Sequence, residues 1–256
     1  MNSSKSVLYT EHLGISFGGL KAVNDFNISI YESEIAGIIG PNGAGKTTVF
    51  NLITGVYAPS EGSVYICRKL MNGRKQHEFV QQGISRTFQN IRLFKKMTVL
   101  ENVKAAMHNR YTYKFSDVVF RRPVYYEQEL AADKEALNLL SIFELHGKTD
   151  KLASELPYGD MRKLEIARAL AANVKILLLD EPACGMNPAE KAELAECINK
   201  VREKFNVAVL LIEHDMNFVM NMCKRIYVLD YGKTIACGTP QEIVSDKRVI
   251  SAYLGG

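Results

Sequence analysis

Long hydrophobic runs are missing from this chain of 256 residues. A membrane-spanning helix needs about 20 consecutive apolar residues, whereas the longest candidates here, at 176–179 and 207–212, have the length of strands. Residues 1–12 also lack the apolar core of a secretory signal. We therefore expect a cytoplasmic protein whose role at a membrane would come through partners.

Cysteine and concentrated charge are scarce as well. The five cysteines are widely spaced and form no CxxC pair, which argues against a disulfide framework or a zinc site. The formal net charge is only +4, and the basic residues are scattered, so we expect no nucleic-acid partner. Neither an internal repeat nor a low-complexity tract occurs. With 47% hydrophobic and 23% charged residues, the composition is typical of a soluble globular protein.

The hydrophobic pattern divides the chain into three stretches. Apolar and polar residues alternate from 7 to 30 around a Gly18-Gly19 turn, which predicts antiparallel β structure. Spacing from 91 to 170 is mostly helical, with the aromatic, basic segment 111–126 interpreted as a loop with short helical turns, or else a surface that touches a membrane partner. After Leu170, strands at 175–179, 207–212, 225–229 and 234–237 alternate with helices at 188–204 and 215–222. This pattern predicts an α/β fold with a largely parallel sheet and a separate helical lobe.

A glycine-rich loop between a strand at 35–39 and a helix from about Lys46 carries the clearest motif. It fits G-x-x-x-x-G-K-[ST], and its residues are Gly40, Pro41, Asn42, Gly43, Ala44, Gly45, Lys46 and Thr47. Its glycines let backbone N–H groups converge on phosphates at a helix N-terminus. Lys46 is expected on the β- and γ-phosphates, Thr47 on Mg²⁺ and Thr48 on the α-phosphate. A chance glycine turn is the alternative, and this context disfavours it.

Two carboxylates, Asp180 and Glu181, follow the apolar residues 176–179 of a predicted strand. A parallel strand next to the strand of the phosphate loop would bring Asp180 to the metal ion. Glu181, one residue further on, is placed to orient and deprotonate an attacking water. A solvated acidic turn is the alternative interpretation of this pair.

The order of these motifs resembles the ATP-binding cassette (ABC) family over nearly the whole chain. The resemblance implies that Phe17 stacks on adenine and that Gln89 reaches both Mg²⁺ and the attacking water. It also implies that His214, after the strand at 207–212, is the switch histidine that bonds the γ-phosphate. ATP and Mg²⁺ are the cofactors that it implies.

The family signature LSGGQ corresponds here to a segment that contains Pro157, Tyr158, Gly159 and Asp160. In the family this segment caps ATP held by a second subunit. Pro157 stands in place of the signature serine, so one hydroxyl contact to the γ-phosphate is missing. Asn187 likewise replaces the usual aspartate of the dimer-contacting loop.

The resemblance implies one nucleotide-binding domain over residues 1–256. A RecA-like P-loop NTPase core with an antiparallel β subdomain would comprise 1–90 and 171–256, and an inserted helical subdomain would comprise 91–170. The implied partners are transmembrane permease subunits and a second ATP-binding subunit, with an indirect link to a periplasmic or extracellular solute-binding protein. Its implied place is the cytoplasmic face of the membrane, as a peripheral subunit.

Within the family, the chain is most similar to the G-type ATPases of branched-chain amino acid importers. The relevant stretches include 86–94, 97–102 and the tail 249–255. The ATPase of lipopolysaccharide export shares much of this pattern and is the alternative within transport. A soluble ABC ATPase of DNA repair or translation would be expected to carry two cassettes or a coiled-coil insertion. A nucleotide kinase would lack the signature segment and His214 in this order.

Overall fold

The computed structural model describes residues 6–110 and 115–254. The chain forms two compact units. The first, which we call the sheet unit, comprises residues 1–89, 175–185 and 201–256. The second, the helical unit, comprises residues 90–174 and 186–200.

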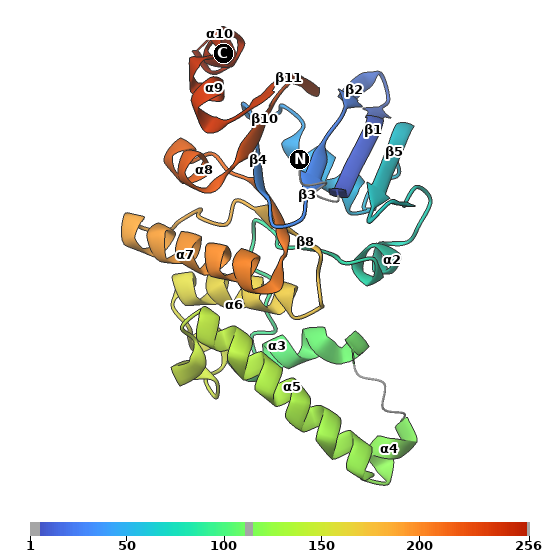
Figure 1. The fold of residues 1–256 in the computed structure, drawn as a ribbon, viewed down its shortest axis with the longest axis vertical. Coiled ribbons are helices and arrows are strands. Elements are labelled where there is room, and N and C mark those ends of the chain that lie inside the picture. Colours follow the sequence, from blue (N-terminus) through green and yellow to red (C-terminus); the bar gives the residue numbers. More distant parts are fainter. Residues whose placement is uncertain (1–5, 111–114, 255–256) are drawn as a thin grey trace. The chain divides into compact units, whose positions relative to one another are not determined.

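An antiparallel sheet fills the N-terminal part of the sheet unit (Figure 1). Its strands have the order β2-β1-β5-β6, and β3 also pairs with β1. Their bounds are β1 (Ser6–Phe17), β2 (Leu20–Phe26), β3 (Ser29–Tyr31), β5 (Glu61–Ile66) and β6 (Lys69–Leu70). Phe17 pairs with Leu20 across the predicted glycine turn, so the antiparallel structure predicted for 7–30 is confirmed.

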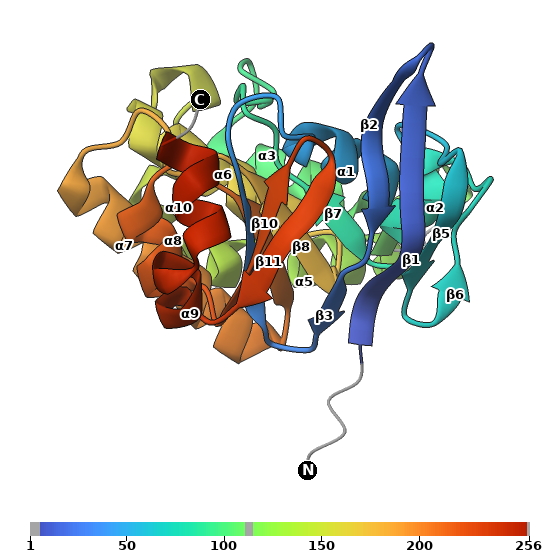
Figure 2. The ribbon, with the colours of Figure 1, turned by 90° about the horizontal axis from the view of Figure 1, so that it is seen from above.

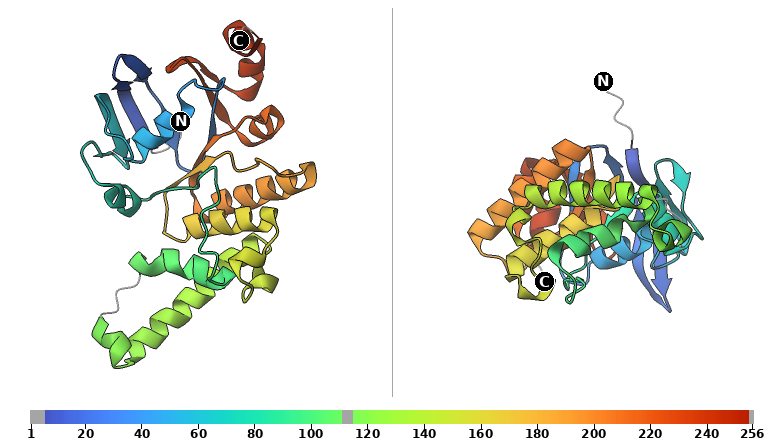
Figure 3. Two further views of the ribbon diagram at one scale, coloured as in Figure 1. Left: turned by 180° about the vertical axis from the view of Figure 1, so that it is seen from behind. Right: turned by 90° about the horizontal axis from the view of Figure 1, so that it is seen from below.

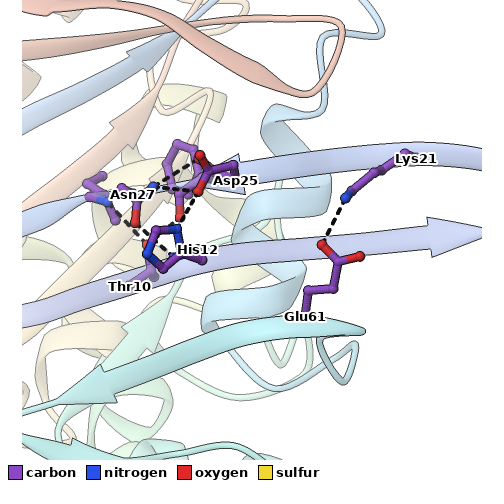
Figure 4. Close-up of polar contacts among 8 residues, drawn as sticks. Thr10, His12, Lys21, Asp25, Asn27 and Glu61 are labelled. Atoms are coloured by element: carbon purple, nitrogen blue, oxygen red, sulfur yellow. Dashed lines mark hydrogen bonds and ion pairs between the residues drawn. The ribbon is translucent and has the colours of Figure 1, made fainter.

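Polar side chains hold the hairpin of β1 and β2 where its ladder is irregular (Figure 4). His12 and Asp25 have left-handed φ values of 50° and 53°. The Asn27 side chain accepts a hydrogen bond from the His12 N–H at 2.8 Å and donates to the Asp25 carboxylate at 3.0 Å. Closer to the turn, Lys21 pairs with Glu61 of β5 at 2.8 Å. These contacts fix the hairpin that carries Phe17.

The second sheet of this unit has the strand order β11-β10-β4-β9-β8-β7. Its strands are β4 (Ile35–Ile39), β7 (Ile84–Arg86), β8 (Ile176–Asp180), β9 (Ala208–Ile212), β10 (Arg225–Asp230) and β11 (Lys233–Gly238). All neighbouring pairs are parallel except β10 with β11. The prediction of a largely parallel sheet is therefore confirmed.

One detail of that prediction is wrong. The strand that ends at Asp180 was expected beside the strand of the phosphate loop, but β9 lies between β4 and β8. Neighbours in a parallel sheet are set by crossover connections rather than by sequence order, and the pattern of apolar residues does not specify them. All these parallel strands still end at the same edge, so Asp180 remains on the side of the loop.

Helices complete the sheet unit. They are α1 (Lys46–Ile53), α2 (Gln76–Gln81), α8 (Met216–Met222), α9 (Pro240–Ser245) and α10 (Lys247–Leu254). Figure 2 shows α9 and α10 beside β11, with which both are in contact. Phe50 of α1 belongs to the same buried cluster as Ile38 of β4 and Leu210 of β9. Burial of α1 on the sheet thus fixes the helix that begins at Lys46.

The helical unit contains α3 (Val99–Met107), α4 (Phe115–Val119), α5 (Pro123–Ile142), α6 (Tyr158–Leu170) and the first part of α7 (Pro188–Phe205). Helix α3 packs against both α5 and α6 (Figure 3). Thr98 caps α3 by accepting from the Glu101 N–H at 3.1 Å. None of the helices in the described residues has the length and apolarity to span a membrane.

The structure of the segment 111–126 differs in part from the predicted loop. Residues 111–114 lie outside the described residues, and α4 is a short helical turn of the expected kind. From Pro123 onward the prediction is wrong, because α5 runs for 20 residues. Proline suits the first turn of a helix, because the backbone N–H groups there have no hydrogen-bond acceptor within the helix. Arg122 pairs with the buried Asp117 at 3.1 Å and fixes the corner before α5.

Candidate active site

The glycine-rich loop joins β4 to α1 and is pressed closely against neighbouring strands. Gly40, Gly43 and Gly45 have φ values of 151°, 80° and 101°. A Cβ on Gly40 would lie 2.1 Å from the Leu229 carbonyl oxygen, and one on Gly45 would lie 2.8 Å from the Ala22 carbonyl oxygen. The backbone therefore requires glycine at these two positions, and the loop curves around the N-terminus of α1 as the motif predicts.

Lys46 places a desolvated cation inside this loop. Its ammonium group donates to the carbonyl oxygens of Gly40 and Pro41 at 2.7 and 2.8 Å. Burial lowers the pKa of Lys46, and the charges of Glu181 and Asp180 oppose that lowering. An anion that replaces part of the lost hydration stabilises such a buried ammonium group, so the loop suits a phosphate.

A pocket of about 440 Å³ opens on this loop. Among its lining residues are Phe17 from the antiparallel sheet, Lys46, Thr47 and Thr48 from the loop and α1, and Glu181 and His214 from the ends of β8 and β9. The structure thus brings these predicted site residues together around one cavity. Phe17 also makes an edge contact with Tyr57, with 5.3 Å between ring centroids, and this contact orients the Phe17 ring.

Asp180 lies at the carboxyl end of β8 in a buried ion pair. The Arg86 guanidinium donates to Asp180 Oδ2 at 2.6 Å, and both side chains are 8% exposed. Arg86 also donates to Asn51 at 2.7 Å. Sequence reasoning missed Arg86, because an arginine in a short strand has no distinctive pattern. Its contact holds the Asp180 carboxylate at the end of β8.

Two oxygen-bearing side chains at this site are of a kind that suits Mg²⁺. No group of three His, Cys, Asp or Glu side chains able to hold a metal occurs within 6–110 and 115–254. Magnesium typically takes one or two protein oxygens and completes its shell with phosphate and water. The Thr47 hydroxyl and the Asp180 carboxylate are donors of that kind.

Glu181 connects two of the other predicted site residues. Its Oε2 accepts from Gln89 Nε2 at 2.8 Å, and its Oε1 lies 2.7 Å from His214 Nε2. Glu181 itself has a φ of 50°, which is unfavourable for a non-glycine residue. Strained backbone of this sort tends to occur at functional sites. Gln89 and His214, from separate segments of the chain, therefore converge on the Glu181 carboxylate beside the phosphate loop.

Glu213 is a buried carboxylate that the sequence analysis did not single out. It is 3% exposed, and it accepts from the backbone N–H groups of Ala183 and His214 at 2.7 and 3.1 Å. Burial raises the pKa of Glu213, although these hydrogen bonds partly oppose the shift. Glu213 thereby joins the segment after Glu181 to the segment that carries His214, and it positions both.

A pH dependence of stability follows from Glu213. Its pKa is raised above the ordinary value of 4.5 in the folded protein. Its stability contribution is therefore fully present below about pH 4.5 and falls as the pH rises through the raised pKa. The side chain introduced by Glu213→Gln cannot ionise, so the free energy of unfolding of the variant relative to wild type should increase over this range. Urea unfolding at several pH values tests this, and a constant difference would contradict it.

The signature segment belongs to the helical unit. Pro157 is the N-cap of α6, and Gly159 lies in its first turn. A Cβ on Gly159 would approach Glu190 Oε1 to 3.1 Å, so little space is left there. Asp160 pairs with Lys148. A helix therefore begins at the signature segment, and no hydroxyl group stands at position 157.

Comparison with protein-family models matches residues 23–184 to "ABC transporter" and residues 233–256 to "Branched-chain amino acid ATP-binding cassette transporter". The chain is 42% identical to the high-affinity branched-chain amino acid transport ATP-binding protein BraF of Pseudomonas aeruginosa, over 98% of this chain and 99% of the relative. It is 33% identical to the lipopolysaccharide export system ATP-binding protein LptB of Haemophilus influenzae, over 98% of both chains.

Solved structures give the same result. The ADP conformation of MJ1267, an ATP-binding cassette of an ABC transporter, superposes with a TM-score of 0.84 at 32% identity, over 98% of this chain and 99% of that one. MJ0796, described as a dimeric bacterial ABC transporter cassette, gives a TM-score of 0.75 at 26% identity, over 91% of this chain and 98% of that one.

The sheet with a glycine loop at the end of β4, together with the helical unit, defines the class of ATP-binding cassettes. The chain belongs to the ABC transporter family and is an ATP-binding ATPase of that family. The resemblance seen in the sequence, the fold class and the enzymatic activity it implied are confirmed.

Proposed function

We propose that this protein is the ATP-hydrolysing subunit of an importer for branched-chain amino acids. The observation that carries the proposal is the match of the C-terminal residues 233–256 to the branched-chain transporter model, beside the 42% identity to BraF over nearly full length. The lower identity of 33% to LptB makes lipopolysaccharide export the weaker candidate.

Nucleotide binding is assigned to the pocket on the glycine loop. Backbone N–H groups of residues 42–46 would surround the phosphates, and the Lys46 ammonium would neutralise part of their charge. Thr48 is assigned to the α-phosphate, and Phe17 to the adenine ring. Support comes from the position of Phe17, Lys46 and Thr48, together with residues 42–45, on one cavity.

Glu181 is assigned as the general base for the attacking water. Its two carboxylate oxygens contact Gln89 and His214, which hold it in one orientation. Thr47, Asp180 and the side-chain oxygen of Gln89 would hold Mg²⁺, which supplies charge neutralisation on the β- and γ-phosphates when bound. General-base assistance of this kind contributes about 10²- to 10⁴-fold in rate.

ATP binding is proposed to join two cassettes. Pro157, Tyr158, Gly159 and Asp160 of one subunit would cap the nucleotide held by a second ATP-binding subunit, with backbone groups at the start of α6 in place of a serine hydroxyl. Hydrolysis would separate the two cassettes again, so ATP shifts the equilibrium between the separate and the joined state. The division of the chain into a core (1–90 and 171–256) and a helical subdomain (91–170) stays a prediction.

The remaining partners are proposed from the same family. Transmembrane permease subunits would dock on the cassette at the cytoplasmic face of the membrane, and a periplasmic or extracellular solute-binding protein would act through them. The position of this chain is therefore proposed to be peripheral.

Affinity purification of the tagged chain from membranes of its host, in mild detergent, tests the partners. We expect two different multi-span permeases and a second cassette ATPase to co-purify. Permeases accompanied by lipopolysaccharide-bridge components, without a second ATPase, would favour export instead. Recovery of the chain without any membrane protein would contradict a transport role.

A further inference from the structure

The turn between β10 and β11 lies against the phosphate loop. Asp230 pairs with Lys233, so Tyr231 and Gly232 form a two-residue hairpin loop. The Gly232 N–H donates to the Ala44 carbonyl of the phosphate loop at 2.9 Å, and the Gly232 carbonyl accepts from the Asn24 N–H of β2 at 2.8 Å. The turn is thus fixed on both sides.

Tyr231 is an unusual residue for this turn. Both central residues have positive φ, 43° for Tyr231 and 76° for Gly232, as in a type I′ hairpin. That geometry favours Asn, Asp or Gly at the first position, whereas a bulky aromatic residue is strained there. A residue that contradicts a local rule without a structural gain is a candidate for function.

Packing against the described residues does not explain the aromatic ring. Tyr231 is 87% exposed, more than any other large hydrophobic side chain in the described part of the chain. It lines the nucleotide pocket that also contains Phe17 and Lys46, and it borders a neighbouring pocket of about 970 Å³ between the loop and α10. The ring therefore stands at the mouth of the site on a turn that is hydrogen-bonded to the phosphate loop.

We infer that Tyr231 is a second aromatic contact for the nucleoside part of the bound nucleotide, in addition to Phe17. This inference rests on the proposed nucleotide site. An aromatic face can stack on a base or cover a ribose, and the ligand then supplies the packing that the exposed ring lacks in the folded chain. Contact with the bound nucleoside, rather than packing within the folded chain, then compensates for the strained backbone at position 231.

The variant Tyr231→Asn separates binding from folding. Asparagine suits the left-handed position, so the melting temperature should stay equal or rise. ATP affinity, measured by displacement of a fluorescent ATP analogue, should fall at least about fivefold, the change that corresponds to stacking of about 1 kcal/mol. Inorganic tripolyphosphate has no nucleoside, so its affinity should be unchanged. Tyr231→Phe should bind ATP like wild type.

Tyr126→Asn provides a matched control, since Tyr126 is also an exposed tyrosine (48%) and belongs to the helical unit; its ATP affinity should not change. Unaltered ATP affinity in Tyr231→Asn would overturn the inference and leave the proposed function intact. Equal losses for ATP and tripolyphosphate would also overturn it, because Tyr231 would then act through the loop. Wild-type protein that fails to bind ATP would overturn the proposed function as well.

Discussion

Glu181→Gln is expected to leave ATP binding within about twofold of wild type and to lower the rate of ATP hydrolysis by about 10²- to 10⁴-fold. Glutamine has nearly the same shape and can still contact Gln89 and His214, which now bond to the Glu181 carboxylate at 2.8 and 2.7 Å. It cannot accept the proton of the attacking water. Steady-state ATPase assays and equilibrium nucleotide binding measure the two effects.

The same variant should accumulate as an ATP-bound dimer, because hydrolysis no longer releases the two subunits. Size-exclusion chromatography with and without ATP would detect it. Glu11→Gln is the matched control, since Glu11 is an exposed carboxylate of β1 that is not among the residues lining the pocket. Near-normal ATPase activity in Glu181→Gln would show that another group is the base.

Lys46→Ala should weaken ATP binding by about 10- to 100-fold, the range for a lost hydrogen bond to a charged group. Lys46 is 7% exposed, and its ammonium group donates to the loop carbonyls of Gly40 and Pro41. Its removal takes away the cation of the phosphate site. The melting temperature should change little, because a buried ammonium with a lowered pKa contributes little to folding.

Lys21→Ala is the control for this experiment. Lys21 lines the same pocket, but its ammonium pairs with Glu61 at 2.8 Å. Its loss should change ATP affinity by less than about threefold, as expected for a partly exposed charge that already has a partner. Equal effects of the two substitutions would indicate that general positive charge, rather than Lys46, holds the phosphates.

Local motifs were the part of the site that the sequence predicted directly. The glycine loop and the pair Asp180 and Glu181 each lie within a few residues, and each follows a buried strand, so their placement needs little tertiary information. The roles of Gln89 and His214 came from family order alone. Their contacts with Glu181 depend on the strand order of the sheet, which no local pattern encodes.

The missed features share that dependence on tertiary structure. Arg86 reaches Asp180 because β7 pairs with β8, and Glu213 is buried because its segment returns over Ala183. The insertion of β9 between β4 and β8 is of the same kind. Tyr231 could have been noticed in the sequence as an aromatic residue before Gly232 in a hairpin, but its link to the loop needed the structure.

Uptake by proteoliposomes that contain the co-purified complex tests the central claim most directly. With ATP enclosed on the side of this chain and the solute-binding protein supplied on the other side, we predict accumulation of radiolabelled leucine. The accumulation should stop in Glu181→Gln complexes. Normal ATP hydrolysis without uptake of leucine, isoleucine or valine would contradict the account.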